Sequence, residues 1–144
     1  MKLHLNKWVL IVIFGAFALA MLVILILGEQ RIAVITDKKD YENGGSLKVK
    51  IQNLFLKKIC FSSCYPYYLE RKEGAWKAYS YQDCSKANIT EKCMEPSETK
   101  AFEIALPLIE EGAHRIAVPI CESCNTGGQF QESQRFYSNE FEVK

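Results

Sequence analysis

The sequence predicts an all-β sandwich of about seven strands that follows one N-terminal transmembrane helix. Three observations support this prediction. The run from Trp8 to Leu27 contains twenty residues and no charge. Beyond it, short segments alternate apolar and polar residues between turn residues and show no long helical period, which is typical of all-β domains. All six cysteines lie in this second part of the chain.

The apolar run Trp8–Leu27 has the length of a membrane-spanning helix. At about 1.5 Å per residue it would cover roughly 30 Å, the thickness of the hydrocarbon core of a bilayer. A cleaved signal peptide is the alternative, since Lys2 and Lys7 precede the run and Ala16–Ala20 offers small residues for cleavage. Cleavage there would leave the apolar segment Met21–Leu27 at the new terminus, so we expect an uncleaved signal anchor.

The cysteines indicate which side of the membrane the second part occupies. Basic residues flank the apolar run on both sides, so the positive-inside rule gives only a weak bias. Six cysteines, an even number in a small domain, favour an oxidising compartment. We therefore expect a cytoplasmic segment at residues 1–7, a signal anchor at residues 8–28 and an extracytoplasmic domain at residues 31–144 of a cell-membrane protein.

The expected strands are short and separated by turns. Leu47–Gln52 has the clearest period-two alternation, and the turn Tyr41–Gly45 precedes it. A hairpin around Gly74 should pair residues whose numbers sum to about 147 or 148. The other expected strands are Arg31–Thr36, Tyr67–Arg71, Trp76–Tyr81, Lys100–Leu106, His114–Ile120 and Tyr137–Val143. Their buried faces should share one interior formed by Val49, Ile51, Phe102, Ile104, Ile116, Val118, Phe141 and Val143.

Several segments carry a family resemblance. They are Asp40–Gly44, Leu47–Asn53, Cys64–Arg71, Gly112–Ile116 and Ser138–Phe141. Together they resemble bacterial immunoglobulin-like domains over Arg31–Lys144. The resemblance implies an immunoglobulin-like sandwich, and it implies little about function because such domains serve as general extracellular modules.

Six cysteines, at positions 60, 64, 84, 93, 121 and 124, are the candidate disulfide residues. We expect Cys64 to pair with Cys84, because the hairpin register brings them opposite each other, and Cys60 to pair with Cys93 or Cys121. All six sulfurs should gather at the end of the sandwich that faces the membrane. A four-thiolate zinc site is the alternative. A thioredoxin-like centre at Cys121–Cys124 is not favoured, because Asn125–Gly128 does not begin a helix.

Other residues are also candidate sites. Tyr65, Tyr67 and Tyr68 form a candidate binding surface, as tyrosines do in paratopes, although alternate tyrosines on a strand also pack inward. We expect His114 to be a satisfied core histidine. Solvated turn charges are favoured over a calcium site at Asp37, Asp40 and Glu42, and Asn88–Thr90 is a glycosylation sequon.

Charge and histidine content exclude some classes of function. The formal net charge of the chain is +1, and Lys2 and Lys7 precede the anchor, so the outer domain has no electrostatic footprint for nucleic acid. His4 also precedes the anchor, and no nucleophile–base pair is evident, so we expect no enzyme, cofactor or metal.

The sequence therefore predicts a membrane-anchored binding or scaffolding module with an unknown protein or surface partner. Two alternatives remain. The domain could be a protease inhibitor that presents the loop Cys84–Cys93, or a zinc-binding or redox protein that uses the cysteines.

Overall fold

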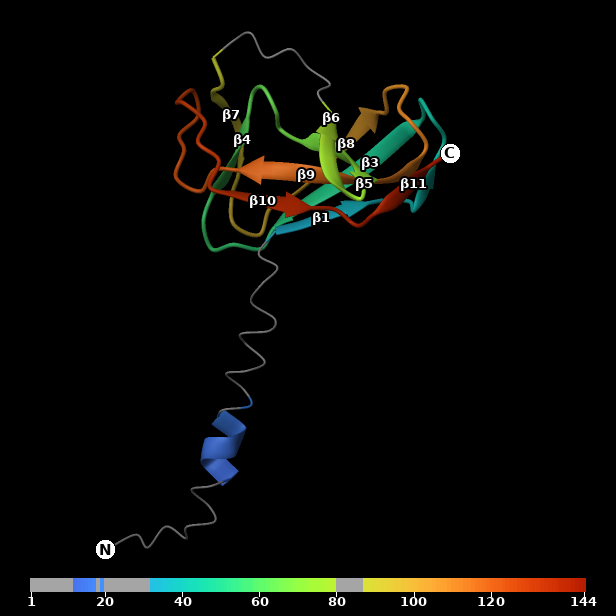
Figure 1. The fold of residues 1–144 in the computed structure, drawn as a ribbon. Coiled ribbons are helices and arrows are strands. Elements are labelled where there is room, and N and C mark those ends of the chain that lie inside the picture. The colour runs from blue at the N-terminus through green and yellow to red at the C-terminus, as the bar shows by residue number, and fades with distance from the viewer. Residues whose placement is uncertain (1–11, 18, 20–31, 80–86) are drawn as a thin grey trace, which may run out of the picture. The chain divides into compact units, whose positions relative to one another are not determined.

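The computed structural model describes residues 12–17, 19, 32–79 and 87–144 (Figure 1). The chain divides into two compact units, Met1–Arg31 and Ile32–Lys144. In the first unit, residues 12–17 are helical and exposed, and most of the expected span Trp8–Leu27 lies outside the described residues. Within the described residues, no helix has both the length and the apolar character that a membrane crossing requires.

The second unit contains eleven strands within its described residues, arranged in three sheets. A three-stranded sheet has the order β1-β3-β8, and the large sheet has the order β2-β11-β9-β5-β6, with β10 also paired to β9. Strands β4 and β7 form a separate pair. The bounds are β1 Ile32–Thr36, β2 Asp40–Tyr41, β3 Ser46–Asn53, β4 Ile59–Ser62, β5 Tyr68–Glu73, β6 Ala75–Tyr79, β7 Thr90–Met94, β8 Thr99–Ala105, β9 Gly112–Ile120, β10 Gln134–Tyr137 and β11 Phe141–Val143.

This strand order is that of an immunoglobulin-like sandwich. Strands β1, β3 and β8 form one sheet, while the hairpin β5–β6 joins β9 and β11 in the other. The predicted hairpin register is confirmed, since Leu69 pairs with Tyr79 and Arg71 with Lys77. Strand β9 also lies beside β5, antiparallel to it, as expected (Figure 1).

Period-two alternation produces the core. In β3 every second residue is buried, while Lys48 and Lys50 are exposed. Seven of the eight expected interior residues are buried: Val49, Ile51, Ile104, Ile116, Val118, Phe141 and Val143. The eighth, Phe102, is half-buried and stacks on Tyr67 with ring centroids 6.0 Å apart. Strand β8 is an edge strand, so Phe102 lines a cavity of about 420 Å³ instead of lying under another strand.

Two strand predictions need correction. The single strand expected over Tyr137–Val143 is broken into β10 and β11, because side chains between them take over backbone hydrogen bonds. The Ser138 hydroxyl accepts from the Ile116 backbone N–H at 2.9 Å, and the Asn139 amide bonds Thr36. Strands β2, β4 and β7 were not predicted. All four residues of β4 are buried, so its sequence has no alternation.

His114 is a core histidine, although only one of its ring nitrogens is satisfied. The side chain is fully buried between Tyr79 and Phe141, with ring centroids 6.0 Å from each. Its Nδ1 lies 2.7 Å from the Gly112 carbonyl oxygen, which can only accept, so Nδ1 carries the hydrogen. Its Nε2 has no hydrogen-bond partner among the described residues. Burial lowers the pKa of His114 below its usual value.

We expect Ile116→Ala to lower the free energy of unfolding by about 2–5 kcal/mol, because it leaves a cavity in the core. Lys48→Ala should change it by less than about 0.5 kcal/mol, because this side chain points to solvent. Urea unfolding of the full chain in detergent measures both values. A surface-like response at Ile116 would contradict the register of β9.

We expect His114 to make the fold sensitive to acid. Its pKa is lower in the folded than in the unfolded chain, so the stability gained by burying the neutral ring is present above about pH 6.5 and is lost as the pH falls below that value. His114→Phe should unfold with a smaller dependence on pH. Urea midpoints measured between about pH 8 and pH 5 for both chains test this expectation. Equal pH dependence in the two chains would show that the ring does not titrate as expected.

Candidate functional site

The outer face of the large sheet carries several aromatic and charged side chains. The strand registers pair Lys72 with Trp76, Glu70 with Arg115, and Tyr137 with Ala117. Residues opposite each other on antiparallel strands share a face. Strands β6, β5, β9 and β10 therefore present one surface, which we call the ladder face. Its residues are Tyr68, Glu70, Lys72, Trp76, Arg115, Arg135 and Tyr137.

Arg115 is the centre of the ladder face. Its guanidinium carbon lies 4.2 Å from the centroid of the Trp76 ring and 3.7 Å from that of Tyr137, so an aromatic ring covers each side of the guanidinium group. Its Nε donates to Glu70 at 2.7 Å. The terminal amino groups of Arg115 make no hydrogen bond to any residue that the structure describes. Stacking and this hydrogen bond hold Arg115 in place, and its side chain is 18% exposed.

Glu70 is the buried carboxylate of the ladder face. Its side chain is 7% exposed and is compensated by Arg115 and, at 4.0 Å, by Arg135. Arg135 stacks on Tyr68 and donates two hydrogen bonds to Glu132, which raise the pKa of Arg135. Burial raises the pKa of Tyr68. Since removing one member of a buried charged set leaves the others uncompensated, these residues act as a unit.

The three tyrosines expected to form one surface are divided between two faces. Tyr65 and Tyr68 stack with ring centroids 5.0 Å apart, and Tyr68 belongs to the ladder face. Tyr67 points the other way, packs against the core and stacks on Phe102. All three are half-buried. The proximity of Trp76, Arg115 and Tyr137 was missed, because it depends on pairing between strands far apart in the sequence.

The described cysteines are all in disulfides. Cys60 is bonded to Cys93, one of its two expected partners, with Cα atoms 4.0 Å apart. Cys121 is bonded to Cys124, a pairing that was not expected. Cys64 is also disulfide-bonded, and Cys84, its expected partner, lies outside the described residues. These bonds leave no thiolate for a zinc site in the described part of the chain, where no other metal-binding group is found.

The remaining candidate residues lie in structural contacts. Asp37 accepts a hydrogen bond from the Tyr41 hydroxyl at 2.7 Å, which lowers the pKa of Asp37, and Asp40 pairs with Lys144 at 2.6 Å. Glu42 accepts from the Gly45 backbone through its carbonyl oxygen, within the predicted turn. The sequon residue Asn88 is exposed and accepts from Ser62 at 2.5 Å.

We expect Arg115→Lys to lower the free energy of unfolding by about 1 kcal/mol, because an ammonium group cannot stack between two rings. Lys77→Arg is the matched control, since Lys77 is exposed and pairs only with Glu73 among the described residues, so its effect should stay below about 0.5 kcal/mol. Urea unfolding measures both values. Equal losses of unfolding free energy in the two variants would mean that the stacking of Arg115 on the ladder face contributes no stability.

Comparison with known proteins gives no family assignment. No family model matches the chain, and no curated protein matches it. A Pseudomonas fluorescens alkylpurine DNA glycosylase bound to DNA is similar, with 10% identity and a TM-score of 0.44. The match covers 84% of this chain and 33% of the glycosylase chain, so this chain spans about a third of that protein. A Pyrococcus furiosus CARDB domain shares 16% identity over 78% and 94% of the two chains, with a TM-score of 0.38. A PapD-like domain of human CEP192 shares 14% identity over 78% and 82%, with a TM-score of 0.32. At these values the likenesses carry no functional argument, and the immunoglobulin-like fold rests on the strand order itself.

Proposed function

We propose that this chain is a single-pass, membrane-anchored module whose disulfide-braced domain lies outside the cytoplasm and binds a protein partner through the ladder face. The observation that carries the proposal is the position of Arg115 between Trp76 and Tyr137. Tryptophan, tyrosine and arginine are the residue types enriched in binding hot spots. Tyr137 keeps 45% of its surface exposed on this face.

Rigidity of the ladder face supports a binding role. Stacking and hydrogen bonds already fix the side chains of Arg115 and Arg135, so a partner would lose little side-chain entropy on ordering them. The disulfides support placement in an oxidising compartment, and the apolar run Trp8–Leu27 supports a membrane anchor.

The rival functions have less support. A protease inhibitor would need an exposed loop over Cys84–Cys93, but its C-terminal part is strand β7, paired with β4. An enzyme is also disfavoured, since His114 is the one histidine among the described residues and it is fully buried. We therefore propose a binding module that does not catalyse turnover.

The anchor and its orientation can be tested on the full chain in its native membranes. We expect the chain to resist alkaline carbonate extraction and to retain its N-terminal residues. Protease added to the outer side should digest residues 31–144 once the disulfides are reduced. Release by carbonate, or an N-terminus that begins after Ala18 or Ala20, would contradict the anchor.

Binding can be tested with a photo-crosslinking amino acid at Lys72, an exposed position on the ladder face. The matched control places it at Lys48, which is exposed on the three-stranded sheet. We expect a crosslinked protein adduct from position 72 alone, with a yield that falls when Tyr137→Ala is added. Identical adducts from both positions, or a yield that Tyr137→Ala does not change, would contradict binding at the ladder face.

A further inference from the structure

Three cysteines lie in one row across neighbouring strands. Cys60 in β4 is directly opposite Cys93 in β7. On its other side Cys60 forms an antiparallel bridge with Cys121, through hydrogen bonds of 2.8 and 2.9 Å between their backbones. Directly opposite residues in such a pair have Cα atoms about 5.5 Å apart, within the usual range of a disulfide. Cys60 therefore has two neighbours with which it could be bonded, and it is bonded to one of them.

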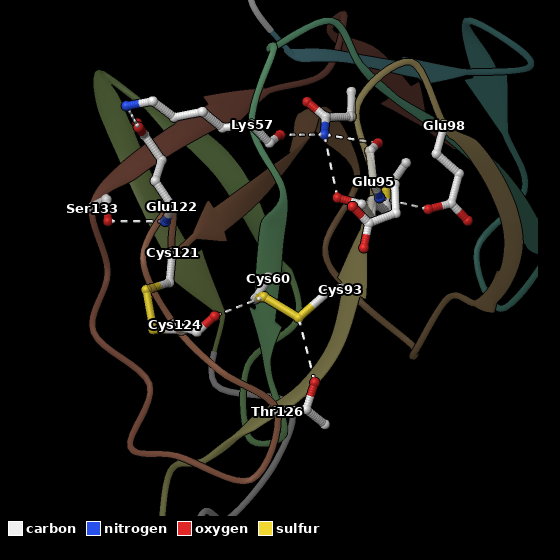
Figure 2. Close-up of a disulfide and its surroundings, with 12 residues drawn as sticks. Lys57, Cys60, Cys93, Glu95, Glu98, Cys121, Glu122, Cys124, Thr126 and Ser133 are labelled. Atoms are coloured by element: carbon white, nitrogen blue, oxygen red, sulfur yellow. Dashed lines mark hydrogen bonds and ion pairs between the residues drawn. A yellow bond between two sulfur atoms is a disulfide. The ribbon is translucent and has the colours of Figure 1, made fainter.

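The Cys60–Cys93 disulfide contacts the backbone of Cys124 (Figure 2). The Cys60 Sγ lies 3.4 Å from the Cys124 carbonyl oxygen. Cys60 and Cys121 are buried, at 1% and 3% exposure, while Cys93 and Cys124 are half-buried. The two bridged residues, Cys60 and Cys121, are thus buried, while their disulfide partners Cys93 and Cys124 are more exposed.

We propose that Cys121–Cys124 is an exchange-active disulfide and that Cys60–Cys93 is its internal acceptor. A thiolate of an external dithiol attacks the accessible Cys124 Sγ, and the Cys121–Cys124 bond breaks with its electron pair on Cys121. The Cys121 thiolate then attacks the Cys60 Sγ. The Cys60–Cys93 bond breaks, its electron pair leaves on Cys93, and Cys60 becomes bonded to Cys121.

The surroundings of Cys93 suit a leaving thiolate. The Thr126 hydroxyl lies 3.6 Å from the Cys93 Sγ, where it can donate to a negative sulfur (Figure 2). The Lys100 ammonium group donates to the Cys93 carbonyl oxygen at 2.9 Å, which places a positive charge on the same residue. Both contacts favour the charged form of the thiol and so lower the barrier to its departure.

The exchange balances as a two-electron reaction. The second thiol of the dithiol attacks the mixed disulfide at Cys124, which releases the oxidised dithiol and a Cys124 thiolate. Cys93 and Cys124 each take up one proton from those that the dithiol lost. Two protein disulfides become one, Cys60–Cys121, and two thiols. The reaction is stoichiometric and does not depend on the ladder face or its partner.

The test uses the full chain in detergent with a limiting amount of dithiothreitol. After an acid quench, free thiols are alkylated and the disulfides are mapped by mass spectrometry. We expect the label on Cys93 and Cys124, together with a peptide linked through Cys60 and Cys121. Label on Cys121 and Cys124 with Cys60–Cys93 intact, or equal label on every cysteine, would overturn the proposal.

Three variants add to the test. The two cysteine variants need no reductant, and the third is compared by the rate at which the Cys93 thiol is released. In Cys124→Ser, Cys121 is left as a free thiol. We expect it to attack Cys60, so that the Cys60–Cys121 link forms and the alkylating label appears on Cys93. Label on Cys121 alone would overturn the proposed exchange. Cys121→Ser is the matched control, in which only Cys124 should be labelled. Thr126→Val should slow the release of the Cys93 thiol several-fold after reduction, and an unchanged rate would remove Thr126 from the mechanism.

Discussion

The hydrogen-bonded position of β9 determines both the core and the outer surface of the domain. This strand pairs with β5, β10 and β11, and Cys121, the residue directly after it, forms the bridge with Cys60. Alternation along it sends Ile116 and Val118 into the interior and Arg115 and Ala117 outward. A shift of one residue would exchange the two sets, so the core and the ladder face cannot change independently.

The small side chain at Ala117 explains how the ladder face closes over the sheet. Tyr68 on β5 and Tyr137 on β10 both pair directly with Ala117, which is fully buried although it points outward. A larger residue there would hold the flanking tyrosines apart. The rings can therefore lie close to the sheet, where Tyr137 supports Arg115 and Tyr68 supports Arg135.

The buried Glu70 favours one arrangement of the side chains on the ladder face. A carboxylate removed from water costs several kcal/mol unless charged hydrogen bonds compensate it. Arg115 supplies one at 2.7 Å, and the rings around Arg115 limit where its guanidinium can lie. The network thus favours a single arrangement of the face over several loosely packed ones, which is the condition under which a binding surface is preorganised.

Local pattern predicted the parts of the fold that depend on local sequence. The alternation in β3 and the turn at Gly74, which has a φ of +73°, were enough to predict a strand and a hairpin register. Strand β4 has no alternation, and the ladder face joins residues 76, 115 and 137, whose proximity only long-range pairing determines. The sequence left Cys60 with two partners, and the structure places both of them beside it.

The cysteines supply connections that the small β4–β7 sheet lacks. A two-stranded sheet is marginal by itself, because each strand has only one neighbour. Cys60–Cys93 joins its two strands, and the backbone bridge from Cys60 to Cys121 ties β4 to the end of β9. If Cys60 were bonded to Cys121 instead of Cys93, β4 would be covalently joined to the end of β9 and no longer to β7. Strand β7 would still be held through Thr90, whose backbone bonds Gly127 and Gly128 at 2.9 and 2.8 Å. The exchange therefore changes which strand is braced without requiring the core around β9 to open.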